Sequence, residues 1–191
     1  MEKQVNRWKK YPIIILLPLF ILLLSFKTTI FFTNYTLQQQ NAVDYLNGKT
    51  ELQGNYTAAE RSHMEDVQKV FNKGNILFWI LCLIIVGAFF SIKNNKPEII
   101  KILTKSGIIT ISTVIIILIA VIFNFEITFI LFHNIFFPQG NWQFPMDSLL
   151  IQTFPIQFFT KMSIFVFSQA LGWGILFILL SLCLKHEMAH Q

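Results

Sequence analysis

Four long apolar stretches alternate with more polar segments along this chain, at about residues 11–32, 75–92, 107–126 and 162–184. Crossing about 30 Å of hydrocarbon as a helix takes roughly 20 apolar residues, so each stretch is long enough to span a bilayer. Helices satisfy their own backbone hydrogen bonds where no water is present. We therefore predict an all-α integral membrane protein, a four-transmembrane-helix bundle that forms a single membrane domain over residues 1–191.

The segment between the first and second spans, residues 33–74, begins polar and turn-rich and then acquires a helical pattern. Thr57 and Glu60 have the spacing of a capping box, which predicts a helix that begins at this point. Gly74 is placed to end that helix as a C-cap. We expect this helix to carry His63 at the membrane interface.

The segment between the third and fourth spans, residues 127–161, stays apolar although the third span should already end near Asn124 or Glu126. A single helix to Phe137 would have about 30 residues, which predicts either a tilted helix or a break followed by a half-buried helix. A turn is expected at 138–141. The amphipathic stretch 148–159 that follows is interrupted by Pro155 and predicts an interfacial lid.

The short basic segment 93–106 joins the second and third spans. Pro97 is placed to start a small interfacial helix at 98–103, so we expect a hairpin at the membrane surface.

The distribution of charge predicts the orientation of the spans. With the N-terminus inside, the inner segments hold nine Lys and Arg against three acids, and the outer segments hold six against seven. Because positive residues concentrate on the cytoplasmic side, we expect both termini in the cytoplasm and the segments 33–74 and 127–161 outside. Lysines beside anionic lipid explain the net charge of +5 without nucleic acid as a partner.

Two histidines fall in the predicted outer segments and are the candidate chemical groups. His63 shares a helix face with Glu60, and Asp66, one turn on, could hold its ring nitrogen. His133 lies among Ile, Leu and Phe, and an ionisable residue at membrane depth is a functional candidate by default. Glu126 lies two turns before His133. A surface-helix histidine and an interfacial anchor histidine are the plainer interpretations of His63 and His133.

A metal site is a weaker interpretation of the same two histidines. Zinc would need a third ligand such as Asp66, Glu126 or Asp147. A non-enzymatic membrane subunit that binds metal, haem or quinone through its outer histidines is the alternative function, and a purely structural four-span partner is a third. We expect no metal and no cofactor.

The sequence around these residues resembles the Lit family of bacterial lipoprotein intramolecular transacylases. The similar motifs are SHMEDV at 62–67, FHNIFF at 132–137 and LLIQTFPIQFF at 149–159, together with Trp142 and Asp147. The resemblance covers the four-span layout and both outer segments. It implies that His63 and His133 are catalytic, and we expect supporting or substrate-binding roles for the following residues: Asp66, Glu126, Asn134, Trp142 and Asp147.

The activity implied by the resemblance is acyl transfer within one lipoprotein at the outer face of the bacterial cell membrane. The sn-2 acyl chain of a diacylglyceryl-modified cysteine would move to the α-amino group of that cysteine and give a lyso-form, N-acylated lipoprotein. A histidine with a pKa near 6.5 can take a proton from an α-ammonium of pKa about 7.7 to 8.0 at a cost of about 2 kcal/mol. We favour His63, with Asp66 beside it, as the base and His133 as the oxyanion partner.

Overall fold

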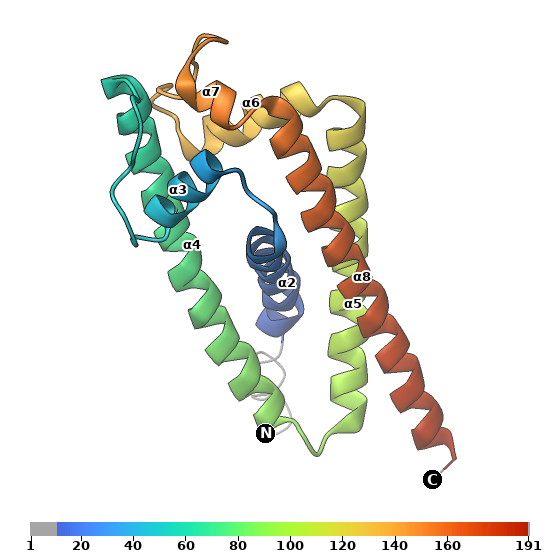
Figure 1. The fold of residues 1–191 in the computed structure, drawn as a ribbon. Coiled ribbons are helices and arrows are strands. Elements are labelled where there is room, and N and C mark those ends of the chain that lie inside the picture. Colours follow the sequence, from blue (N-terminus) through green and yellow to red (C-terminus); the bar gives the residue numbers. More distant parts are fainter. Residues whose placement is uncertain (1–10, 191) are drawn as a thin grey trace. The chain divides into compact units, whose positions relative to one another are not determined.

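The computed structural model describes residues 11–190, and the regular secondary structure in this range is entirely helical, with no strand. Four of its helices are long and apolar enough to cross a membrane, which confirms the all-α, four-span prediction. The basic residues Lys3, Arg7, Lys9 and Lys10, which entered the charge count, lie outside the described range. The helices are α2 (Tyr11–Phe32), α3 (Leu37–Leu46), α4 (Ala58–Ser91), α5 (Lys96–Phe123), α6 (Phe125–Phe136), α7 (Leu149–Thr153) and α8 (Ile156–Ala189) (Figure 1).

Two predicted helix boundaries are wrong. In each case the structure has one longer helix where the sequence predicted a shorter one. Helix α4 continues through Gly74, which does not adopt the positive φ of a C-cap; in the described residues only Gly48, Gly54 and Gly140 do so. A helical glycine costs about 1 kcal/mol relative to alanine, which the packing of the following apolar residues outweighs. The inner helix expected at 98–103 is simply the start of α5, because Pro97 occupies the first turn, where a missing N–H breaks no helical hydrogen bond.

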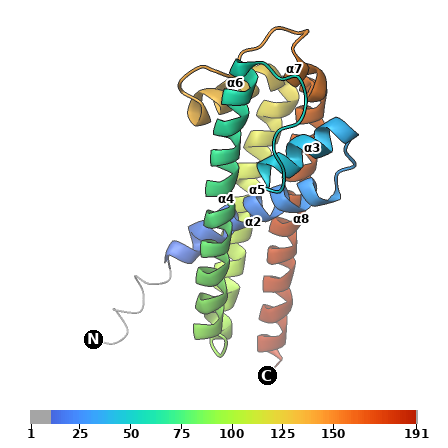
Figure 2. The same ribbon diagram turned by 60° about the vertical axis from the view of Figure 1, so that its left-hand side comes forward.

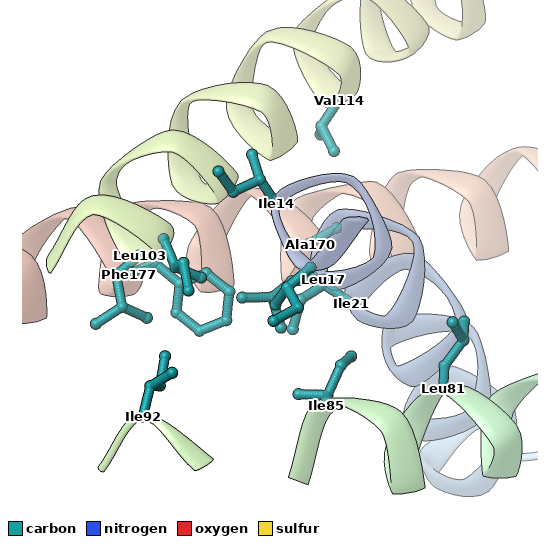
Figure 3. Packing of buried hydrophobic residues seen from close by; sticks show 12 residues of the cluster. Ile14, Leu17, Ile21, Leu81, Ile85, Ile92, Leu103, Val114, Ala170 and Phe177 are labelled. Atoms are coloured by element: carbon teal, nitrogen blue, oxygen red, sulfur yellow. The ribbon is translucent and has the colours of Figure 1, made fainter. Parts of the chain in front are cut away.

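One compact unit of the chain comprises residues 11–29, 78–119 and 165–190 of the described range. Its core is purely apolar and is formed by one face of each long helix, as Figure 3 shows for Leu17 and Ile21 of α2, Ile85 of α4 and Phe177 of α8. The opposite faces carry large exposed aliphatic side chains, such as Leu83 at 74% exposure. Aliphatic surface of this extent is unfavourable in water and fits lipid tails.

Small residues allow α5 and α8 to approach closely within this unit. A Cβ atom on Gly107 would lie 2.9 Å from the carbonyl oxygen of Gly174. Such close backbone contact is a usual way for helices to pack in lipid, where apolar burial adds little. In the same unit, the Gln169 side chain bonds to both Thr28 and Thr29.

The second compact unit comprises residues 30–77 and 120–164 and contains α3, α6 and α7. Figures 1 and 2 show α6 and α7 beside the first turns of α4. Side-chain amides tie these elements together: Gln68 of α4 donates to the Tyr45 carbonyl of α3 at 2.6 Å, and Gln39 of α3 donates to the Thr153 carbonyl of α7 at 2.9 Å. A small apolar core, which includes Ala42 and Met64, lies beneath them.

The break after the third span occurs at Asn124, which decides between the two predicted arrangements. Helix α5 ends at Phe123, and the Asn124 side chain accepts a hydrogen bond from the Ile127 amide at 3.0 Å and caps α6. The predicted break at Pro155 is also present, between α7 and α8. The residues after it do not belong to a separate lid, because α8 already begins at Ile156.

Candidate functional site

The buried carboxylate of Glu60 organises the start of α4. The predicted capping box is formed, since the Glu60 amide bonds to Thr57 Oγ1 at 3.2 Å and the Thr57 amide bonds to Glu60 Oε2 at 2.7 Å. The other oxygen, Oε1, accepts a hydrogen bond from the Leu150 amide of α7 at 2.8 Å. One side chain that is only 1% exposed therefore holds α7 against α4.

Glu60 remains ionised in this environment. Burial by itself raises the pKa of a carboxyl group, but the hydrogen bonds from the Leu150 and Thr57 amides outweigh it and hold the pKa of Glu60 below its usual range. Glu60 and His63 both lie in the polar first half of α4, ahead of the apolar stretch that begins at residue 75.

The structure brings the two predicted histidines together. The rings of His63 on α4 and His133 on α6 lie with their centroids 6.1 Å apart and their planes at 29°. Both residues are buried, at 6% and 8% exposure. Phe137 and Phe144 flank the His63 ring, with centroids at 4.9 and 5.7 Å. The pair therefore lies in an apolar, largely aromatic environment.

His133 is held in one tautomer by its own helix. Its Nδ1 lies 2.8 Å from the carbonyl oxygen of Phe129, so Nδ1 carries the hydrogen and the neutral ring has its lone pair on Nε2. The rings of Phe129 and Trp142 lie against it, with centroids at 4.0 and 4.8 Å. Burial lowers the pKa of His133, and the hydrogen bond to Phe129 opposes that shift.

His63 is the more strongly perturbed of the two imidazoles. Burial, followed by the neighbouring His133, lowers the pKa of His63 to about 4, while Asn141 and Asp66 act in the opposite direction. His63 is therefore neutral at pH 7, and any positive charge on the pair is favoured on His133.

Asp66 does not bond directly to His63, contrary to the prediction. The carboxylate of Asp66 accepts hydrogen bonds from Lys69, Gln139 and Asn141, at 2.9, 2.9 and 2.8 Å. Within the described structure, His63 Nδ1 is buried and has no hydrogen-bond partner. Asn141 donates a hydrogen bond from Nδ2 to Asp66. The buried Oδ1 of Asn141 is then the atom that could accept a hydrogen bond from His63. The Asn141 amide therefore stands between Asp66 and His63, and within the described residues its Oδ1 and His63 Nδ1 are both unpaired.

The sequence interpretation missed Asn141 because the stretch 138–141 reads as a turn. The turn is present, with Gly140 at φ +76°, and it carries Asn141 back to α4 across 75 residues of sequence. The available signal for a functional role of Asn141 was its polar side chain at the end of a turn that lies between Phe137 and Trp142. It could not have identified Asp66 as the partner.

Of the four other residues predicted to support the site, one lies in the site and three lie outside it. Trp142 contacts His133, and its Nε1 is buried without a partner in the described structure. Glu126, Asn134 and Asp147 are exposed, whereas both histidines are buried. Asn134 follows His133 on α6 and so points about 100° away. The structure therefore does not gather these three side chains at the histidines.

The suggested three-ligand zinc arrangement is likewise not formed. The described part of the chain contains no group of three or more His, Cys, Asp or Glu side chains that could hold a metal ion.

Comparisons with known proteins identify the fold and the family. A family model described as lipoprotein intramolecular transacylase Lit matches residues 35–159, the segment that contains both histidines and Asn141. A protein of Aquifex aeolicus that carries no functional description is 28% identical over 121 residues, 63% of this chain and 54% of that protein. This chain thus spans about half the length of the curated relative it matches.

Solved structures of the Bacillus cereus membrane integral lipoprotein intramolecular transacylase Lit have the same fold. One matches with a TM-score of 0.84 at 18% identity over 99% of this chain and 100% of that chain. Variants of that enzyme with a histidine replaced by alanine or by arginine match with TM-scores of 0.73 and 0.69, at 18% and 20% identity. They cover all of this chain and 98% and 96% of their own. Since the family model covers well over half of the sequence, the chain belongs to the Lit family of lipoprotein intramolecular transacylases.

Proposed function

We propose that this protein moves the sn-2 acyl chain of a diacylglyceryl-modified lipoprotein cysteine to the α-amino group of the same cysteine. The observation that supports the proposal most directly is the buried imidazole pair, His63 and His133, at a centroid distance of 6.1 Å in an aromatic environment. Nucleophile and acyl donor belong to one molecule, so the protein's task is to orient them and to move protons.

The reaction has a simple proton balance. The substrate's α-ammonium loses a proton, and its nitrogen attacks the sn-2 ester carbonyl carbon. As the tetrahedral adduct collapses, the carbon–oxygen bond to the glyceryl group breaks, and the leaving oxygen takes a proton. The nitrogen sheds a second proton to become the amide. One proton is released in total, and no cofactor enters the balance.

The geometry supports different roles for the two histidines. His63, whose pKa is low, stays neutral and accepts the second proton, which the nitrogen sheds after its attack. A hydrogen bond from its Nδ1–H to Asn141 Oδ1 would leave the Nε2 lone pair for that proton. His133 takes the ammonium proton on Nε2, because its Nδ1–H is already bonded to the Phe129 carbonyl, which stabilises the imidazolium. It then donates that proton to the leaving oxygen and stabilises the oxyanion.

The membrane placement completes the proposal. The charge distribution supports a bacterial cell-membrane protein with both termini in the cytoplasm and the histidine pair at the outer leaflet, where a lipoprotein's diacylglyceryl group lies. The aromatic side chains around the pair suit a substrate that brings acyl chains with it. Membrane lipids and the lipoprotein are then its partners.

Expression in a bacterial strain that lacks lipoprotein N-acylation tests the function. The protein should generate lyso-form, N-acylated lipoprotein N-termini, detected by mass spectrometry. His63→Ala and His133→Ala should each abolish the product while melting as folded proteins. Ser62→Ala is the matched control, because Ser62 is the exposed neighbour of His63. Full activity in both histidine variants would refute the proposed mechanism.

A further inference from the structure

The C-terminal end of α8 carries a second histidine pair: His186 lies in the last turn of the helix, and His190 directly follows Ala189, where the helix ends. His186 and His190 are four residues apart and both are exposed. Their Nε2 atoms lie 3.1 Å from each other, with ring centroids at 4.4 Å. The sequence analysis overlooked this His-x-x-x-His spacing.

The distance between these nitrogens suits a shared metal ion. Bonds from a metal to imidazole nitrogen are about 2.0–2.1 Å long, so two nitrogens 3.1 Å apart subtend an angle of about 98° at the ion. This angle lies between those of square-planar or octahedral and tetrahedral coordination. We propose that His186 and His190 form a two-ligand site for a divalent transition metal ion of the Cu²⁺, Ni²⁺ and Zn²⁺ class.

The end of the helix brings the two rings together. The His190 amide lies 3.4 Å from the Glu187 carbonyl, one turn back, and the two Nε2 atoms are already 3.1 Å apart, so chelation requires no large change of backbone. The exposed side chains leave the remaining coordination positions to water. Glu187 is engaged with Lys96 of α5 at 3.6 Å, and the described residues offer no third ligand in position.

The ligand chemistry sets the expected order of affinity. Imidazole nitrogens favour Cu²⁺ over Ni²⁺ and Zn²⁺, whereas Mg²⁺ and Ca²⁺ prefer oxygen ligands and should not bind. His63 and His133 offer a different environment: both are buried, and Nδ1 of His133 is already bonded to Phe129. The two pairs can therefore be told apart by mutation.

The test uses the full-length protein in detergent without a purification tag. Titration calorimetry with Zn²⁺ and with Cu²⁺ should show one equivalent of each ion, and the electron paramagnetic resonance spectrum of bound Cu²⁺ should show coupling to two nitrogens. His186→Ala and His190→Ala should each weaken binding at least tenfold. Binding should persist in the His63→Ala/His133→Ala variant.

A spacing control separates chelation from histidine content. The double variant Lys185→His/His186→Ala keeps the number of histidines but moves the helical one about 100° around α8, away from its present position beside His190. Its affinity should fall as far as that of the single variants. Unchanged affinity in this control, or in either single variant, overturns the proposal, as does binding that disappears when His63 and His133 are replaced.

Discussion

Asn141 donates a hydrogen bond to Asp66 at 2.8 Å and leaves its own buried oxygen toward His63. The amide thereby lies between the Asp66 carboxylate, which also bonds to Lys69, and the buried imidazole of His63. A carboxylate in direct contact would favour the imidazolium form strongly. A hydrogen bond from His63 Nδ1–H to this oxygen would orient the ring while leaving it neutral, as the role proposed for His63 requires.

Replacement of Asn141 should therefore impair the reaction without abolishing it. We expect Asn141→Ala to lower kcat about 10- to 100-fold, the usual effect of losing a group that orients a catalytic histidine. Asp66→Asn should have a smaller effect, and the double variant should be less than additive because both residues act along one path. Steady-state kinetics of the purified variants would measure this, and additive effects would contradict the shared path.

The stability of the protein should decrease in mild acid. The pKa of His63 falls from 6.5 to about 4 on folding, so between these values the unfolded chain binds more protons than the folded one. Unfolding is then favoured as the pH falls from 6.5 toward 4, by up to about 3 kcal/mol for this group. The drop in Tm between pH 7.5 and pH 5.5 should be smaller in His63→Gln than in the wild-type protein. An equal drop in both would show that His63 does not cause the effect.

Loss of the Glu60 carboxylate should destabilise α7. Glu60→Ala leaves the buried Leu150 amide and the Thr57 amide without acceptors, at about 1–3 kcal/mol for each buried unpaired group. We expect a lower Tm and faster hydrogen exchange in residues 149–153. Glu65→Ala, at an exposed position of the same helix, is the control and should change neither measurement.

The indole N–H of Trp142 should contribute to the reaction separately from its ring. Its Nε1 lies buried beside His133 with no hydrogen-bond partner among residues 11–190, and a free donor in that position can bond to a developing oxyanion. Trp142→Phe keeps an aromatic ring against His133 but removes the donor, and we expect kcat to fall about tenfold with KM nearly unchanged. A rise in KM alone would assign Trp142 to substrate binding.

Local sequence patterns correctly predicted the features that depend on neighbouring residues, namely the membrane spans, the start of α4 and two helix breaks. The lengths of the apolar stretches gave the four spans, and the Thr57 and Glu60 spacing gave the start of α4. Asn124 and Pro155 both mark real breaks. Gly74 misled because a glycine signals a helix end only where the backbone adopts positive φ, and the apolar stretch behind it keeps the helix intact.

The contacts within the site depend on partners that are far apart in sequence. Glu60 bonds to an amide 90 residues away, and Asp66 bonds to Asn141 at a separation of 75 residues. No periodicity encodes such pairs. For the same reason, chemistry and motif suggested site roles for Glu126, Asn134 and Asp147 but could not show where their side chains lie. All three side chains are exposed.

Helix α6 has an electrostatic consequence for the residue near its end. His133 lies in the last turn of this 12-residue helix, and the Phe137 amide caps its carbonyl. Aligned peptide dipoles place partial negative charge at a helix C-terminus, which stabilises a nearby cation by about 0.3–2 kcal/mol. Helix α6 therefore does more than position His133: its dipole favours the protonated imidazole that the proposed mechanism needs at this residue.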